Sequence, residues 1–296
     1  MWRVTLLAVD IGNTNVTLGL FEDAELVGSW RATTRADATP DEAAALVHDM
    51  LALEHHGTDV LTAVAIASVV PSLTEAFSQF VRRRIQIDPL VVDAASLDGI
   101  LAINIDRPAE AGADRLCNAL AAGIEVGGPA IVVDLGTSTN FDVIDAAGTY
   151  LGGAIAPGLG LSLEALVGRA SKLPQIDLRR PARAIGSNTV HAMQAGTVLG
   201  YIGLVSGLLT ALRGELAELS PSGSRVTVFA TGGYTAEPWL DDVPGIDRIE
   251  PDLTLRGIGY AWERISAARA THDAAHDGQA RGGQAHGGPA HRGASA

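Results

Sequence analysis

The spacing of apolar residues in the first third of the chain predicts strands and helices in alternation. Residues 5–12 form an apolar run typical of a buried strand. Residues 16–23 and 25–33 are predicted to pair as a hairpin. Residues 39–56 repeat apolar positions with a helical period, after a threonine and a proline that are typical of a helix start.

Three further elements continue this pattern. We expect a buried strand over residues 61–71, a helix over residues 72–85 and a short strand over residues 89–94. Ser72 is predicted to cap the helix, with Glu75 three residues later as in a capping box. The order of these elements indicates an α/β fold.

The second half of the chain restarts the same pattern. The segment IVVDLGTSTNFDVID repeats the strand and polar turn of LLAVDIGNTNVTLGL, so that Asp134 follows Asp10 by 124 positions (134 − 10). Gly28 and Gly152 have the same offset. Chance recurrence in an Ala- and Val-rich chain is the alternative, but it would not reproduce the flanking strands and turns. We therefore expect an internal duplication, with two α/β domains facing each other across a cleft.

These patterns divide the chain into three parts. Residues 1–115 and 116–268 are predicted to form two domains, because 296 residues with 47% hydrophobic content can supply two cores. Residues 269–296 are rich in Gly, Ala, His and Gln and carry almost no bulky apolar side chains. Such a composition cannot offset the entropy of ordering, so this tail is predicted to be disordered.

Charge and cysteine content exclude several classes of function. A formal net charge of −13 leaves no basic excess, which argues against a general nucleic-acid or anionic-membrane surface. Cys117 is the only cysteine, so an intramolecular disulfide is impossible and a reducing compartment is indicated. No secretion signal and no membrane-spanning run of about 20 apolar residues is evident. We expect a cytoplasmic protein without a membrane partner.

The two repeated turns have the chemistry of a phosphate site. Gly12 and Gly136 permit tight turns, and the hydroxyl and amide side chains that follow them add neutral donors. Asp10 and Asp134 would repel phosphate unless a cation lay between, so each aspartate implies a metal ion held directly or through water. A single turn of this kind is also compatible with an ordinary Asx-type turn. Two of them on facing domains predict a site that holds a triphosphate from both sides.

Two other features bear on nucleotide binding. Lys172 is the only lysine and no Gly-rich loop precedes it, so a Walker-type phosphate loop is excluded. Gly232 and Gly233 follow a strand predicted at residues 225–230, and their bare backbone suits a flat adenine or ribose ring. Nucleotide chemistry in this chain must use a design without the Walker lysine.

A helix is predicted from Asp114 onward, with Leu116 and Leu120 on its buried stripe. The helix dipole favours the charged form of Asp114, and Arg115 beside it offers a fork for a carboxylate or phosphate. A kinase needs a positioned base for the attacking hydroxyl, most often an aspartate. On spacing alone, Asp114 is equally compatible with that base and with an ordinary carboxylate at a helix N-terminus.

With these stretches in place, the sequence resembles the type III pantothenate kinase family. This family belongs to the superfamily of sugar kinases, acetate kinase, actin and the heat-shock chaperone ATPases. The resemblance implies duplicated ribonuclease H-like (actin-like ATPase) domains, and it spans residue 6 to about residue 266. It rests on DxGNT at 10–14, GADR at 112–115, DxGT at 134–137, GGxIxPG at 152–158, KLP at 172–174, GxxT at 186–189 and TGG at 231–233.

The resemblance implies phosphorylation of the pantothenate 4′-hydroxyl by ATP, the first step of coenzyme A synthesis, in a homodimer. Asp114 would be the catalytic base. Asp134 would hold a monovalent cation, potassium or ammonium. Asp10 would lie near Mg²⁺ and hold it through water. The expected ATP-binding residues are Asp10, Ile11, Gly12, Asn13, Thr14, Asn15, Val16, Thr17, Thr137, Gly232 and Gly233. The expected pantothenate-binding residues are Ile105, Gly112, Ala113, Asp114, Arg115 and Thr189.

Three positions depart from the family pattern. Ile105 stands where many members carry a tyrosine, Arg107 replaces an amide, and Asn140 stands where the second turn often continues with threonine. Ile105 and Arg107 keep an alternative open, a non-catalytic kinase-like regulator that binds nucleotide. A sugar or acetate kinase of the same superfamily is a third interpretation. None of the departures removes the base or either metal aspartate.

Overall fold

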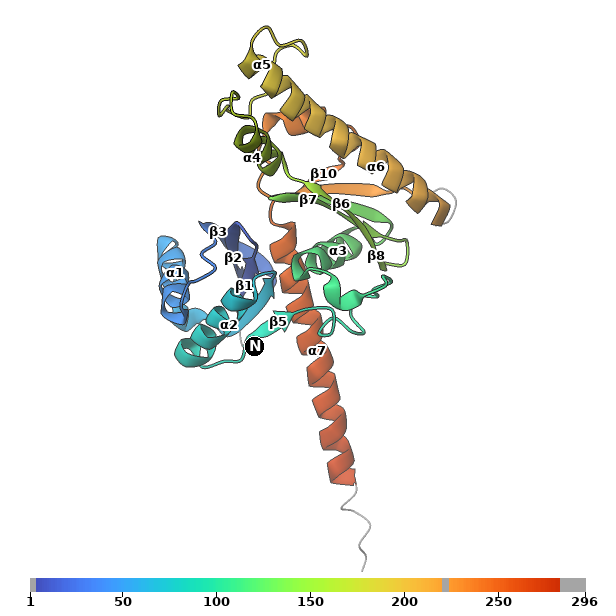
Figure 1. Ribbon diagram of the computed structural model, residues 1–296. Helices are drawn as coiled ribbons and strands as arrows, with labels where there is room; N and C mark the ends of the chain where they lie inside the picture. The colour runs from blue at the N-terminus through green and yellow to red at the C-terminus, as the bar shows by residue number, and fades with distance from the viewer. Residues whose placement is uncertain (1–3, 220–223, 283–296) are drawn as a thin grey trace, which may run out of the picture.

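Two five-stranded sheets with matching strand orders form the framework of the protein (Figure 1). The computed structural model describes residues 4–219 and 224–282. The first sheet is ordered β3 (Glu25–Thr33), β2 (Asn15–Glu22), β1 (Thr5–Ile11), β4 (Ala63–Ser68) and β5 (Leu90–Val92). The second follows the same plan with β8 (Tyr150–Pro157), β7 (Ser138–Ile144), β6 (Ala130–Leu135), β9 (Thr227–Thr231) and β10 (Arg248–Ile249).

The internal duplication predicted from the sequence is confirmed in detail by strand pairing. In each sheet the first strand pairs antiparallel with the second and parallel with the fourth. Gly28 and Gly152 lie at equivalent bulges, where the register shifts between the second and third strands. The turns differ by one residue, because Asp10 pairs with Thr17 whereas Asp134 pairs with Asn140.

Each sheet carries helices on its outer face. In the first half these are α1 (Pro40–Leu53) and α2 (Pro71–Phe80), which is followed by the π-helical turn η2 (Val81–Ile85). Leu7 and Val9 of β1 pack toward them, whereas Leu6 and Ala8 face the opposite side, as the two-residue period of a strand requires. Thr39 caps α1 in a capping box with Glu42, so the predicted start of this helix is confirmed.

The predicted cap of α2 is wrong. The helix begins at Pro71 with Val70 at the N-cap, which makes no side-chain capping bond. Ser72 Oγ instead donates to Ala36 O at 2.7 Å, and Glu75 accepts a bond from a glutamine one turn later. Proline lacks an N–H and has a helical φ, so it starts the helix one residue earlier.

Two helices fill the space between the sheets, α3 (Ala113–Val126) and α7 (Leu253–Gly282) (Figure 1). One hydrophobic cluster includes residues of both helices and of the facing sides of both sheets. A Cβ on Gly257 of α7 would overlap the backbone of Cys117 in α3, so the two helices cross closely. The domain division predicted between residues 115 and 116 falls in the first turn of α3.

The tail differs from its prediction. The structure continues α7 to Gly282, so residues 269–282 are helical where disorder was predicted. Residues added to an existing helix avoid the unfavourable nucleation step, which lowers the apolar content needed to order them. The rest of the predicted tail, residues 283–296, lies outside the described residues.

An arm of helices is inserted in the chain between β8 and β9 of the second sheet. It comprises α4 (Leu159–Arg169), α5 (Thr189–Gln194), η4 (Ala195–Leu199) and α6 (Gly200–Leu219), and α6 packs on the outer face of the sheet (Figure 1). The sequence analysis expected no apolar segment long enough to cross a membrane, and this expectation is wrong. The helical segment Thr189–Leu219 is long and apolar enough to do so by length and composition, since an 18-residue window within it has a mean hydropathy of 1.7. Only 28% of that 18-residue window is buried inside the protein. Short 3₁₀ helices complete the fold: η1 (Thr58–Val60), η3 (Pro108–Glu110) and η5 (Pro238–Asp242).

Candidate active site

The two repeated turns meet at a polar cavity of about 140 Å³ between the sheets. The ends of β1 and β6 form its floor, and the start of α3 and the turn after β9 complete it. The structure brings together many of the predicted site residues, since the cavity is lined by Asp10, Gly12, Asn13, Thr14, Asn15, Thr17, Asp114, Asp134, Thr137, Gly232 and Gly233.

The turns contact each other directly through hydroxyl groups. Thr14 Oγ1 and Thr137 Oγ1 lie 2.6 Å apart in a hydrogen bond. The first amide of each turn closes the turn itself, with Gly12 N donating to Asn15 O at 2.9 Å and Gly136 N donating to a carbonyl two residues on at 3.0 Å. The threonine hydroxyls are therefore donors that each turn presents to the cavity, in line with the phosphate chemistry expected of them.

Three carboxylates converge on this cavity, and the pKa of each is raised. Burial, followed by the charges of Asp114 and Asp134, raises the pKa of Asp10 well above its usual range. Burial and the charge of Asp114 raise the pKa of Asp134 to about 6. Burial also raises the pKa of Asp114, although the Arg115 N–H at 2.9 Å and the Arg115 charge oppose this rise. Burial of three carboxylates together, with repulsion of Asp10 and Asp134 by Asp114, favours a bound cation.

Two glycines are required by the placement of these carboxylates. A Cβ on Gly112, just before α3, would overlap the carboxylate of Asp114. Gly232 has a φ of +94°, and a Cβ there would overlap the carboxylate of Asp134. The GADR and TGG patterns thus each contain a glycine because a carboxylate folds back against the backbone.

A buried amide supports Asp134 from α3. Thr254 Oγ1 of α7 donates to Asn118 Oδ1 at 2.8 Å, and this fixes the orientation of the Asn118 side chain. Asn118 Nδ2 is buried and makes no hydrogen bond of normal geometry with the described residues, but its proximity opposes the rise in the pKa of Asp134. Sequence reasoning missed Asn118, although its position one turn after Asp114 places both on one face of α3.

Arg115, predicted to bind substrate, is engaged inside the protein. Its Nε donates to Asp142 Oδ1 at 2.7 Å, and Tyr150 donates its hydroxyl to the same oxygen at 3.1 Å. Burial raises the pKa of Asp142 to about 7, and the Arg115 charge opposes that rise. Asp142 is fully buried, whereas 16% of the Arg115 side chain is exposed. The pair thus holds the start of α3 against β7.

Other predicted residues lie away from the cavity. Ile11 and Val16 are buried in the core between the first sheet and its outer helices. Ala113 is buried, and Ile105 packs beside Gly152. Thr189 lines a separate groove of about 710 Å³ between α4 and the helices from α5 to α6.

The cavity also contains a cation that the sequence analysis did not identify, Arg31 of β3. The strand register would have revealed it, because Arg31 pairs with Thr17, which in turn pairs with Asp10. Residues in such a row across neighbouring strands lie on the same face of the sheet.

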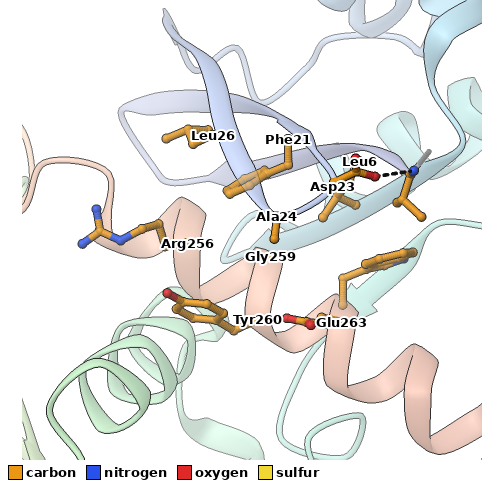
Figure 2. A pocket seen from close by; sticks show the side chains of 11 residues that line it. Leu6, Phe21, Asp23, Ala24, Leu26, Arg256, Gly259, Tyr260 and Glu263 are labelled. Carbon is orange, nitrogen blue, oxygen red and sulfur yellow. Dashed lines mark hydrogen bonds between the residues drawn. The ribbon is translucent and has the colours of Figure 1, made fainter.

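A second, larger cavity of about 650 Å³ lies between the β2–β3 hairpin and α7 (Figure 2). Leu6, Phe21 and Leu26 face Tyr260 and Glu263 of α7 across it (Figure 2). It contains none of the predicted site residues. The smaller polar cavity, which combines carboxylates, hydroxyls and a cation, is therefore the candidate active site.

Comparisons with known proteins identify the family of the chain. Residues 6–211 match the family model described as type III pantothenate kinase. The type III pantothenate kinase of Thermomicrobium roseum is 45% identical over 260 residues, which cover 88% of this chain and 97% of that protein. The type III pantothenate kinase of Roseiflexus sp. is 45% identical over 258 residues, which cover 87% and 98%.

A solved structure shows the same fold at low sequence identity. The activator of the 2-hydroxyisocaproyl-CoA dehydratase from Clostridium difficile, determined with bound ADPNP, has a TM-score of 0.50. The match covers 90% of this chain and 98% of that chain at 10% identity. The predicted duplicated α/β fold is confirmed as that of the actin-like ATPases. The chain belongs to the type III pantothenate kinase family.

Proposed function

We propose that this pantothenate kinase transfers the γ-phosphoryl group of ATP within the cavity between the two turns, with Asp114 as the base. The observation that carries the proposal is that Asp114 opens into the same cavity as Thr14 and Thr137. One hydroxyl comes from each half of the chain, so the phosphates would be held from both sides. The Gly232–Gly233 backbone borders the same space and suits the nucleoside end of ATP.

The chemistry assigned to Asp114 is proton removal. The pantothenate hydroxyl attacks the γ-phosphorus, the bond from that phosphorus to the β,γ-bridging oxygen breaks, and ADP leaves. The hydroxyl proton passes to the Asp114 carboxylate. Because the Arg115 N–H donates to Asp114 Oδ1 at 2.9 Å, one carboxylate oxygen is held and the other is the proton acceptor.

The donor set fits the cations expected from the family. Asp10, Asp114 and Asp134 line one small cavity, and burial together with the charge of Asp114 raises the pKa of Asp10 and Asp134, which a cation would relieve. Among the described residues, no group of three or more acidic, His or Cys side chains is arranged to hold a metal by itself. Asp10 would hold Mg²⁺ through water and Asp134 would hold K⁺ or NH₄⁺, with other oxygens from phosphate, water or backbone. Bound there, the cations neutralise phosphate charge.

The pantothenate site would be built from GADR of one subunit and the arm of another. Asp114 lines the cavity at the start of α3, with Gly112 and Ala113 next to it in the chain, whereas Thr189 lies in the separate groove of the arm. Arg115 would contribute its remaining N–H groups while paired with Asp142. Ile105 would offer only apolar contact where other members carry an aromatic ring.

A homodimer accounts for the apolar surface of the arm. Leu161 and Leu166 of α4 and Val190 of α5 are exposed by 46%, 42% and 39%, and Ile185 between the helices is 81% exposed. Large apolar side chains exposed on one segment of a protein are typical of an interface. Burial against a second copy explains the hydropathy of Thr189–Leu219 without a membrane, and it would bring Thr189 to the partner's site. We place the enzyme in the cytoplasm.

The test is a coupled assay of ADP release with the full-length chain, with and without pantothenate and with and without K⁺. We expect release that requires both. Asp114→Asn should abolish turnover while its affinity for ADPNP, measured by calorimetry, stays nearly unchanged. Asp98→Asn, an exposed aspartate outside the cavity, is the matched control.

Three outcomes would contradict parts of this proposal. Wild-type turnover by Asp114→Asn would remove the base assignment. Nucleotide binding without pantothenate-dependent release would favour the non-catalytic regulator. Release with a sugar or acetate in an acceptor panel, but not with pantothenate, would indicate another kinase of the superfamily.

A further inference from the structure

We propose that Arg31 binds the γ-phosphoryl group of ATP and stabilises its charge during transfer, in the place of the absent Walker lysine. This inference rests on the proposed position of the ATP phosphates between the two turns. Lys172, the only lysine, does not line the cavity, whereas Arg31 does. Arg31 is the only cationic side chain among the described residues that line it.

The strand register explains how Arg31 reaches this place. Asp10 of β1 pairs with Thr17 of β2, and Thr17 pairs with Arg31 of β3, so the three residues form one row across the sheet. Neighbouring strands lie about 4.8 Å apart, which puts the Arg31 backbone about 10 Å from that of Asp10. The long arginine side chain can span much of this distance, and Arg31 lines the cavity together with Asp10 and Thr17.

The guanidinium also reaches the opposite half of the protein. A Cβ on Gly233 would lie 3.1 Å from Arg31 Nη1, so the charged group lies beside the turn after β9. Its positive charge acts on both Asp10 and Asp134, one at each turn. Arg31 is thus a cation of the first sheet placed where the two halves meet.

Arg31 differs from the buried arginines of this protein in its freedom to bind an anion. Arg115 is paired with Asp142, and Arg256 is paired with Glu125 and Glu250. Within residues 4–219 and 224–282, no carboxylate lies within ion-pair distance of Arg31, and its side chain is exposed. A planar guanidinium with unsatisfied donors in a phosphate cavity matches the fork geometry of phosphate oxygens.

The test compares Arg31→Gln and Arg31→Lys with the wild type in the ADP-release assay and by calorimetry. Removing a donor aimed at developing charge typically lowers kcat by about 10²- to 10³-fold, which is the effect expected for Arg31→Gln. We expect Arg31→Lys to recover part of that loss. Affinity for ADPNP should fall about tenfold in Arg31→Gln while affinity for ADP stays unchanged, since only ADPNP carries the third phosphate.

Arg35→Gln is the matched control, because it removes the same charge from an arginine that pairs with Glu42 outside the cavity. Near wild-type kcat in Arg31→Gln would overturn the inference, and so would an equal loss of affinity for ADP and ADPNP. A wild-type protein without pantothenate-dependent ADP release would instead overturn the proposed function. Unchanged circular dichroism of Arg31→Gln shows that the fold is intact, and the binding data then decide.

Discussion

The hydroxyl oxygens of Thr14 and Thr137 lie 2.6 Å apart, although the two residues are 123 positions apart in the chain. Thr14 lies two residues after the glycine of the first turn and Thr137 one residue after the glycine of the second, so this bond joins the two repeated turns. A phosphate that enters between the turns would exchange this bond for two bonds to its own oxygens. The contact therefore marks where the two halves would take hold of the nucleotide.

Replacing either threonine by valine should weaken ATP use. Valine keeps the shape but loses the hydroxyl, and a hydrogen bond to a charged group contributes about 1.5–3 kcal/mol. We expect Thr14→Val or Thr137→Val to raise KM for ATP roughly 10- to 100-fold in the ADP-release assay. Thr210→Val, whose hydroxyl bonds to a carbonyl within α6, is the control. Unchanged KM in both cavity variants would exclude the hydroxyls as phosphate ligands.

The rate should depend on pH through Asp114. A base must be deprotonated to act, and burial raises the pKa of Asp114 above its ordinary value. The rate is therefore expected to be full above the raised pKa and to fall as the pH drops through it, at a higher pH than an ordinary aspartate would give. The profile of kcat/KM for pantothenate measures this. An acid limb at the ordinary aspartate value would contradict it.

Breaking the buried pair between Arg115 and Asp142 should destabilise the fold. In Asp142→Asn the guanidinium loses its anionic partner in a site where Asp142 is 0% exposed. We expect the free energy of unfolding in urea to fall by about 3–5 kcal/mol. Asp41→Asn breaks a pair with Arg84 in which the aspartate side chain is 81% exposed, and it should change stability by less than about 1 kcal/mol. Equal losses in the two variants would contradict this expectation.

The proposed dimer predicts the effect of a charge on the arm. Val190→Asp puts a carboxylate on the exposed apolar surface of α5, and burying that charge against a partner is unfavourable. We expect a wild-type dimer and a monomeric Val190→Asp variant in sedimentation velocity, with pantothenate turnover lost and ADPNP binding retained. Leu53→Asp changes an exposed leucine of α1 and should remain dimeric. A monomeric wild type would refute the interface.

Sequence reasoning reached furthest where the signal is local. The strand that carries Asp10 near its end, its copy with Asp134 and the cap of α1 at Thr39 each follow from residues within one element or turn. A two-residue or helical period states which face of an element is buried. The repeat added a relation between distant segments, and its matching sheets and bulges are present in the structure.

Contacts between distant segments decided the rest. Ser72 bonds to Ala36 rather than capping α2, because the helix already begins at Pro71. Arg115 pairs with Asp142 inside the protein because burial of a carboxylate requires a partner charge.

The composition of the active site was decided in the same way. The sequence by itself determined the two aspartate turns, since strand, turn and side-chain chemistry are encoded within a few residues. Only the tertiary structure decided that Arg31 and Asn118 join them, because strand register brings Arg31 to the cavity and helix packing places Asn118 behind Asp134. Local periodicity specifies which face is buried, whereas the partner that each buried charge meets depends on how the faces pack together.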